Sequence, residues 1–186
     1  METFTYKEIL QQPSCWIKEY EVLLEEKTRI QAFLEKYLTN ETDIVLTGAG
    51  TSAFIGDAIA PLLRGVWKNV RAVATTDIVT NAADYLVADK PLLLISFARS
   101  GNSPESVAAV NLANAICKNV AHIYITCNKN GHLAQSANAE NILSLLLPEE
   151  TDDKSLAMTS SFSTMLLTCL MISQIDHIEA ERERIE

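Results

Sequence analysis

The sequence predicts an α/β domain in three layers, with a doubly wound, five-stranded parallel sheet between two layers of helices. The chain has 186 residues, of which 48% are hydrophobic and 21% charged, and these are ordinary values for a globular domain. From residue 43 onward, five short apolar runs alternate with segments long enough to form crossover helices. The runs are continuous rather than alternating, which is typical of strands covered on both faces.

Residues 1–40 are predicted to form a helical extension, followed by a domain that covers residues 41–186. Thr5 and Glu8 have the spacing of a capping box, which marks the start of a helix. Pro13 has no backbone N–H to donate, so we expect this first helix to end there.

A second helix is predicted from Trp16 to Leu38, because apolar side chains recur there at helical spacing. A helix does not leave such a stripe in water. We therefore expect the stripe to join two copies as a homodimer, with packing on its own sheet as the alternative. The polar segment Thr39–Thr42 is predicted to be the linker to the domain.

The predicted strands follow the five apolar runs Ile44–Leu46, Val70–Ala74, Leu92–Ile95, Ile123–Ile125 and Ile142–Leu147. The predicted helices of the domain are Ser52–Arg64, Thr76–Asn81, Ser103–Lys118, His132–Ala137 and one from about Thr159 to beyond Asp176. The tail that follows, to Glu186, is still helical in character and carries no Gly, Asn or Pro as a stop signal.

Charge and composition exclude several classes of function. The chain has 15 Lys and Arg against 24 Asp and Glu, a net charge of -9, and it lacks the basic cluster that phosphate neutralisation on nucleic acids requires. The N-terminus has no apolar signal segment, and the longest nearly apolar run, Phe162–Ile172, is too short to cross a bilayer. We expect a cytoplasmic protein without a nucleic-acid or membrane partner.

The four cysteines and three histidines are scattered along the chain. None of them has the spacing of a metal site, so we expect no metal. Cys117, Cys127 and Cys169 are predicted to be buried thiols of a protein in a reducing compartment.

The first candidate loop, Gly48–Ser52, follows the first predicted strand and opens a helix. Its glycines allow a ligand to approach the backbone closely. The helix N-terminus offers unpaired N–H groups, and Thr51 and Ser52 add hydroxyl donors. The alternative is a plain glycine turn with a hydroxyl as the helix cap.

The second candidate loop, Ser96–Glu105, follows the third predicted strand. Ser103 suits the N-cap, Pro104 the first helical position and Glu105 the first turn. Those roles do not explain the stretch before Ser103, which consists of Arg99, Ser100, Gly101 and Asn102. For Arg99 the alternative is a solvated surface position.

The two loops lie side by side if the strand order is 2-1-3-4-5, because they then flank the topological switch point. The hydroxyls of Thr51, Ser52, Ser100 and Ser103 would converge there, as a phosphate requires. A dinucleotide site is the competing interpretation: Gly48-x-Gly50-x-x-Ala53 fits the looser fingerprint, and Asp77 could meet a ribose.

The motifs GAGTS at Gly48–Ser52 and ARSGNSPE at Ala98–Glu105 resemble those of the sugar isomerase (SIS) domain family. The resemblance implies a flavodoxin-like sheet of order 2-1-3-4-5, a phosphosugar as the ligand and no cofactor. It implies a phosphate site made of Gly50, Thr51, Ser52, Arg99, Ser100, Gly101, Asn102 and Ser103. Ala98 stands where many members carry a serine, so one expected hydroxyl is missing.

A third segment, Leu156–Phe162, is similar to the family's loop after the fifth strand. The resemblance implies that Leu156, Met158 and Thr159 lie near the sugar; an N-cap is the alternative explanation. SFARSGNSPES and SLAMTSSFST together resemble the bacterial group of tagatose-6-phosphate isomerases and galactosamine-6-phosphate deaminases.

The implied activity is that of an aldose–ketose isomerase or amino-sugar deaminase, which needs a base, a ring-opening group and a grip on the phosphate. We assign no catalytic residue, because Glu105, Glu149, Glu150 and His132 all have simpler roles. In the family the base comes from a second domain or subunit, so we expect this chain to be an N-terminal half. A phosphosugar-sensing regulatory domain and a nucleotide-binding domain are the alternatives.

Overall fold

The computed structural model describes residues 3–185 and contains a five-stranded parallel sheet in the order β2-β1-β3-β4-β5. This confirms the predicted fold class and strand order. The strands are β1 (Asp43–Gly48), β2 (Val70–Ala72), β3 (Leu92–Ala98), β4 (Val120–Thr126) and β5 (Ile142–Leu146).

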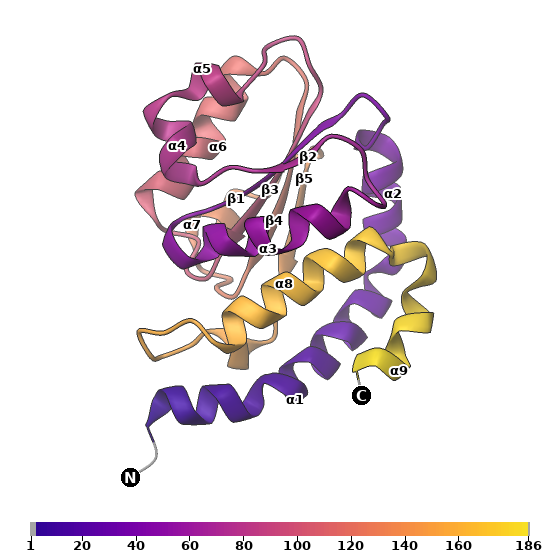
Figure 1. Ribbon diagram of the computed structural model, residues 1–186, viewed down its shortest axis with the longest axis vertical. Helices are drawn as coiled ribbons and strands as arrows, with labels where there is room; N and C mark the ends of the chain where they lie inside the picture. Colours follow the sequence, from indigo (N-terminus) through magenta and orange to yellow (C-terminus); the bar gives the residue numbers. More distant parts are fainter. Residues whose placement is uncertain (1–2, 186) are drawn as a thin grey trace.

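Helices cover both faces of the sheet (Figure 1). One face packs against α4 (Thr75–Thr80), α5 (Ala82–Tyr85), α6 (Pro104–Ile116) and α7 (His132–Gln135). The other packs against α1 (Phe4–Glu25), α2 (Lys27–Tyr37), α3 (Ala53–Leu63) and α8 (Ser160–Ser173). Short 3-10 helices span Gly50–Ser52, Glu149–Thr151 and Ile175–Glu181, and α9 is Arg182–Ile185.

The central strands are buried along their whole length, which is why their sequences are continuously apolar. Alternate residues enter different cores. Ile44 and Leu46 face the core shared with α1, α3 and α8, whereas Val45 faces the core shared with α4 and α6. Two hydrophobic layers therefore fix the sheet, and with it the positions of the loops at its carboxyl edge.

The predicted end of the first helix at Pro13 is wrong, because α1 continues from Phe4 to Glu25 with Pro13 inside it. Proline deprives the carbonyl of Ile9 of its usual donor. The side-chain amide of Gln12 donates to that carbonyl instead, at 3.0 Å, and Pro13 itself is exposed. The predicted continuous helix Trp16–Leu38 is also wrong, since the helix is interrupted at Glu26, between α1 and α2.

The predicted capping box of Thr5 and Glu8 is not formed. Thr3 is the N-cap of α1, and its hydroxyl accepts a hydrogen bond from the amide of Tyr6 at 3.3 Å. Glu8 is buried and its carboxylate turns away from the helix toward Lys154 and Ser155. The carboxylate has three donors available there, whereas a capping box would give it one backbone N–H.

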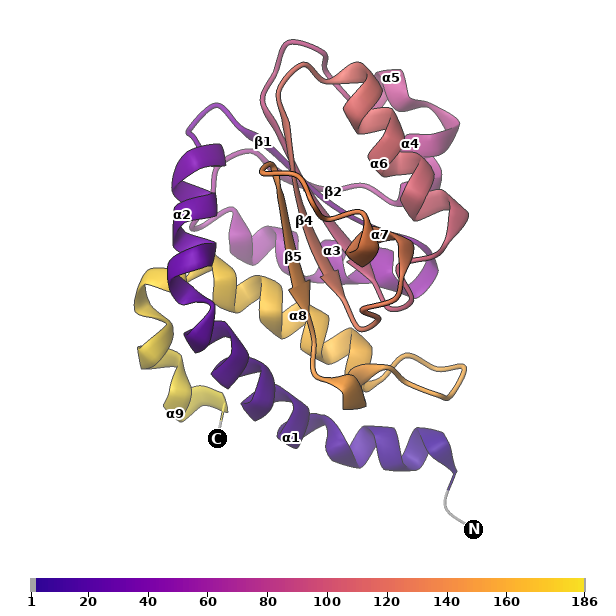
Figure 2. The ribbon, with the colours of Figure 1, turned by 180° about the vertical axis from the view of Figure 1, so that it is seen from behind.

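The apolar stripe of α1 packs on α8 of the same chain, and Figure 2 shows the two helices running side by side. Tyr20 and Leu23 are buried in that contact. The stripe therefore packs within its own chain, which is the alternative stated above to a dimer contact. The homodimer itself stays a prediction, as does the division into segments 1–40 and 41–186.

Several further boundaries differ from the prediction, and two of these differences have a visible cause. The second strand ends at Ala72 rather than Ala74, because Ala74 becomes the N-cap of α4. The last long helix ends at Ser173 rather than beyond Asp176, and the chain turns so that Ile175 and Ile178 enter the core. Met1, Glu2 and Glu186, all placed in predicted helices, lie outside the described residues.

Among residues 3–185, no helix combines the length and the apolar character needed to cross a lipid bilayer.

Glu19 is a buried carboxylic acid in the contact between α1 and α8. Its side chain is 1% exposed and accepts one hydrogen bond, from the hydroxyl of Thr168 at 2.9 Å, while its second oxygen has no partner. Burial raises the pKa of Glu19 to about 8. At neutral pH the folded protein therefore keeps a proton that the unfolded chain releases.

We predict that Glu19→Gln makes the protein more stable relative to wild type as the pH rises. The unfolded chain releases its Glu19 proton near pH 4.5 and the folded protein near pH 8, so the stability of wild type falls across that window. The glutamine has no proton to lose. Melting temperatures of both proteins at about pH 5 and about pH 9 measure the difference. Glu21→Gln, at an exposed position on the same helix, is the control, and parallel curves for Glu19→Gln and wild type would contradict the assignment.

Candidate functional site

The first candidate loop is shaped by a close approach of its own backbone. β1 ends at Gly48, and the 3-10 helix Gly50–Ser52 leads into α3. A Cβ atom on Gly48 would lie 2.6 Å from the carbonyl carbon of Ser52, so no side chain fits there. Gly50 has a φ of +56°, the left-handed region that favours glycine. These constraints turn Ser52 inward, where it is 4% exposed.

The second candidate loop is fixed by contacts with the loop after β4. The carbonyl of Arg99 accepts hydrogen bonds from the amide of Cys127 at 3.3 Å and from the hydroxyl of Thr126 at 3.4 Å. Gly101 has a φ of +66°. Gly131 passes so close that a Cβ on it would lie 2.3 Å from the carbonyl oxygen of Ser100. The sequence analysis missed Gly131, which is recognisable only once the two loops are adjacent.

Ser103 is the N-cap of α6, as predicted. Its hydroxyl accepts from the amide of Ser106 at 3.3 Å and donates to the hydroxyl of Ser106 at 2.6 Å. Pro104 takes the first helical position and Glu105 the first turn. The N-terminus of α6 is thereby directed at the same region as the first loop.

The two loops and the third segment enclose a small hollow of about 140 Å³ at the carboxyl edge of the sheet. Its lining comes from β3 and three loops and consists of Ala49, Ser52, Phe97, Ala98, Arg99, Ser100, Gly101, Ser103, Ser106 and Met158. A larger hollow of about 290 Å³ lies between α3 and α8, but most of its lining side chains are apolar. The smaller one is at the switch point between β1 and β3.

Hydrogen-bond donors dominate this hollow. Within the described residues, the backbone amides of Ser100 and Gly101 donate to no protein acceptor. Arg99 is the one ionisable residue in the lining, and it has no carboxylate partner in the part of the chain described. An uncompensated guanidinium beside free amides and hydroxyls suits an anion with several oxygens.

The structure brings some of the predicted residues into this hollow and leaves others outside it. Ser52, Ser100 and Ser103 line it together with Arg99 and Gly101. The predicted residues outside the lining are Gly50, Thr51, Asn102, Leu156 and Thr159.

The residues outside the lining have other surroundings. Thr51 is exposed, and Asn102 accepts a hydrogen bond from the amide of His132 at 2.8 Å. Leu156 is 98% exposed. Thr159 is bonded to Asp153.

The third segment reaches the hollow through Met158, whose sulfur accepts a hydrogen bond from the hydroxyl of Ser52 at 3.8 Å. Asp153 holds the end of this segment, since its carboxylate accepts from the amides of Thr159, Ser160 and Ser161 at 2.8, 3.2 and 2.9 Å. Asp153 thus caps α8 from outside the helix. A cap six to eight residues upstream does not follow the usual sequence pattern, which is why it was missed.

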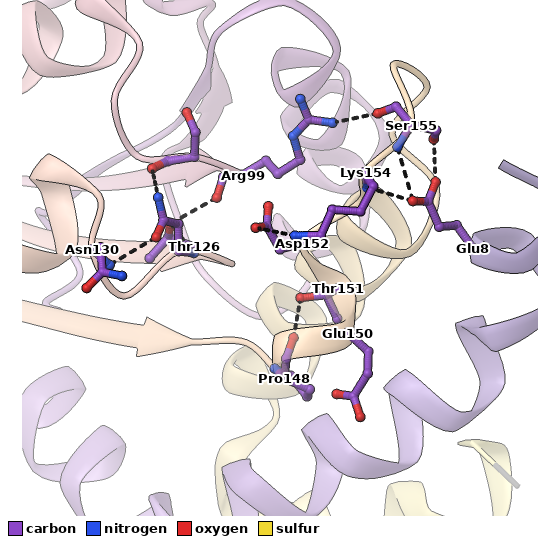
Figure 3. Close-up of polar contacts among 12 residues, drawn as sticks. Glu8, Arg99, Thr126, Asn130, Pro148, Glu150, Thr151, Asp152, Lys154 and Ser155 are labelled. Atoms are coloured by element: carbon purple, nitrogen blue, oxygen red, sulfur yellow. Dashed lines mark hydrogen bonds and ion pairs between the residues drawn. The ribbon is translucent and has the colours of Figure 1, made fainter. Parts of the chain in front are cut away.

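The third segment, taken together with the residues before it as residues 150–162, is bound to α1 and to the second loop, as Figure 3 shows. The carboxylate of Glu8 accepts from the amides of Lys154 and Ser155 at 2.6 and 3.1 Å, and from the hydroxyl of Ser155. The carbonyl of Ser155 accepts from the guanidinium of Arg99 at 3.3 Å. Three segments far apart in the sequence are thereby connected.

None of the acids or histidines considered as bases borders the hollow. Glu105, Glu149, Glu150 and His132 are exposed side chains outside its lining. Burial raises the pKa of Cys127, next to the second loop, to about 12, and it lowers the pKa of His122, inside the sheet, to about 4. Both groups are therefore neutral at pH 7. Within residues 3–185, no three His, Cys, Asp or Glu residues cluster in a way that could bind a metal ion.

Comparison with known proteins gives a consistent set of matches. The family model described as the SIS domain matches residues 37–173. D-galactosamine-6-phosphate deaminase AgaS of Escherichia coli is 50% identical over 185 residues, which are 98% of this chain and 48% of that protein. The protein of the same name from Shewanella sp. strain ANA-3 is 46% identical over 175 residues, 91% of this chain and 45% of that one.

A solved structure agrees with the sequence matches. The crystal structure of tagatose-6-phosphate ketose/aldose isomerase from Escherichia coli superposes with a TM-score of 0.93 at 49% identity, covering 98% of this chain and 51% of that one. The chain therefore spans about half the length of the curated relatives it matches.

We predict that Gly48→Ala lowers the free energy of unfolding by about 1–3 kcal/mol, the cost of forcing a methyl group into a packed site. The new Cβ would overlap the backbone of Ser52. Gly50→Ala is the matched control, since no atom lies within 4 Å of its Cβ position and it costs only the left-handed conformation, about 1 kcal/mol. Urea denaturation measures both variants. Equal losses would show that the contact with Ser52 does not constrain Gly48.

Proposed function

We propose that this chain, which belongs to the SIS domain family, is the phosphate-binding part of a phosphosugar isomerase or deaminase. The observation that carries the proposal is the hollow at the switch point. Among the described residues, its lining includes several serines, two residues whose amides have no protein acceptor and an arginine without a carboxylate partner. These are the groups that recognise a phosphate, which accepts hydrogen bonds and carries negative charge.

The names of the relatives suggest the class of sugar. One relative is named a galactosamine-6-phosphate deaminase, and a matching structure is named a tagatose-6-phosphate isomerase. Both names indicate a hexose that is phosphorylated at carbon 6. We therefore propose that the ligand is a 6-phosphohexose with an amino or keto group at carbon 2. We also propose that its reaction needs neither a metal nor a cofactor.

The proposed reaction needs proton transfer and binding of the phosphate, and the described residues support the second of these. Isomerisation moves a proton between carbons 1 and 2 of the open sugar, which needs a base within hydrogen-bond reach. Binding of the remote phosphate supplies orientation for that step. The residues around the hollow provide the grip, with Ser52 and Ser100 as hydroxyl donors, Ser103 as the cap of α6 and Arg99 as the cation.

Calorimetric titration tests the proposal directly. Galactosamine 6-phosphate or tagatose 6-phosphate is expected to bind, and NAD is not. The NAD arm tests the dinucleotide interpretation, for which Asp77 would have to reach a ribose; its side chain is exposed in the first turn of α4. Binding of NAD alone would refute a phosphosugar site.

We predict that Ser52→Ala and Ser100→Ala each weaken binding of the phosphosugar by about 1.5–3 kcal/mol, the range for hydrogen bonds to a charged group. Each variant removes one hydroxyl from the lining of the hollow. Ser14→Ala, at an exposed position on α1, is the control. Dissociation constants from calorimetry give the comparison, and wild-type affinity in both site variants would mean that the phosphate lies elsewhere.

We predict that these 186 residues alone bind the phosphosugar but do not turn it over. The only ionisable residue in the lining is Arg99, whose guanidinium stays protonated and cannot act as a base. Assays of ammonia release and of ketose formation measure turnover. Robust turnover would place the base within the chain, and Glu149, Glu150 and His132 would be the first residues to replace.

The absence of an ionisable base in the lining also favours one alternative, a domain that senses a phosphosugar and regulates a partner. The two proposals differ in one measurement. A longer chain with a second domain that turns the sugar over supports the enzyme, whereas binding without turnover in that longer chain supports the sensor.

A further inference from the structure

We infer that Glu8 is a positioning residue for the phosphate site, acting through Ser155 on the guanidinium of Arg99. The inference rests on the proposed phosphosugar site and adds to it a residue from the N-terminal helix. Glu8 is 5% exposed and lies outside the lining of the hollow. Its role follows from what its carboxylate binds.

Both carboxylate oxygens of Glu8 accept hydrogen bonds from the third segment. One oxygen accepts the amides of Lys154 and Ser155, at 2.6 and 3.1 Å, and the other accepts the hydroxyl of Ser155. These partners are 146 and 147 residues away in the sequence. Charge-assisted hydrogen bonds of this kind are stronger than neutral ones, so Ser155 is fixed at both its amide and its side chain.

The backbone of α1 strengthens the same contact. The hydroxyl of Ser160 donates to the carbonyl of Glu8 at 2.7 Å, and the side-chain amide of Gln11 donates to the carbonyl of Glu150 at 2.8 Å. One turn of α1 therefore holds the third segment at its beginning, middle and end. Leu156 in this segment is 98% exposed, whereas Met158 and Phe162 pack against the core.

Ser155 in turn orients Arg99, as the dashed contacts in Figure 3 show. The backbone of Arg99 is fixed by Thr126 and Cys127, but its long side chain has several rotamers to choose from. The carbonyl of Ser155, at 3.3 Å, is the acceptor that the guanidinium has within the described residues. A guanidinium has five N–H donors, so this bond leaves others free to face a phosphate.

Removing the carboxylate should therefore weaken phosphate binding without touching the site itself. We expect Glu8→Ala to raise the dissociation constant for galactosamine 6-phosphate about tenfold. Glu8→Asp keeps the charge but shortens the reach, and it serves if the alanine variant does not fold. Glu8→Gln should restore most of the affinity, because its carbonyl oxygen can accept both amides and its NH₂ group can donate to Ser155.

A matched control separates positioning from a general weakening of α1. Glu19→Ala removes another buried side chain from the same helix, one that contacts Thr168 and not the third segment, and so weakens the packing of α1 on α8. It is expected to leave the dissociation constant at the wild-type value. A loss of affinity in Glu19→Ala equal to that in Glu8→Ala would show that α1 acts only through overall stability, and would overturn the inference.

A double-mutant cycle with Arg99→Gln provides the decisive readout. If Glu8 acts through Arg99, then Glu8→Ala should change the affinity less than about twofold once the guanidinium is gone, because the two effects are coupled. An additive loss would overturn the inference. Equal affinities of wild type and Arg99→Gln would also overturn it, while leaving phosphosugar binding intact. If wild type itself does not bind, the proposed function fails and the inference with it.

Hydrogen exchange without any ligand tests the first step independently. Residues 153–158 should exchange faster in Glu8→Ala than in wild type, because the amides of Lys154 and Ser155 lose their acceptor. Unchanged exchange there would show that Glu8 does not fix the third segment and would refute the proposed pathway.

Discussion

Burial of the parallel sheet on both faces is the constraint on which the rest of the structure depends. Strands covered by two helical layers must all run in one direction when helices form the crossovers, so their carboxyl ends meet at one edge. The order β2-β1-β3-β4-β5 then places the loops after β1 and β3 next to each other. Two segments about fifty residues apart, at Gly48 and Ala98, become neighbours because β1 and β3 pair in register as far as Gly48 and Phe97.

Close backbone packing converts that proximity into a defined shape. Gly48 admits the backbone of Ser52, and Gly131 admits the carbonyl of Ser100, at distances that no side chain would tolerate. The backbone of both loops is therefore held in a defined shape around the hollow.

The sequence predicts the sheet well because its signals are local: continuous apolar runs, two glycine-serine loops and the cap at Ser103. It fails where a contact outside the usual sequence patterns decides. Pro13 remains inside α1 because Gln12 replaces the missing donor, and the cap of α8 comes from Asp153 rather than from Thr159. Gly131 likewise looks like an ordinary turn residue until Ser100 lies beside it. None of these outcomes has a pattern at fixed spacing from which it could be read.

The buried carboxyls of this protein show how one helix can serve two purposes. Glu19 has one partner and one unsatisfied oxygen, so its proton is the means by which burial is tolerated. Glu8 has donors at both oxygens, so it holds the third segment at two points. The first belongs to the packing of α1 on α8, and the second connects that packing to Arg99. A helix that looks like a simple cover for the sheet thereby becomes part of the route by which the fold sets the geometry of the site.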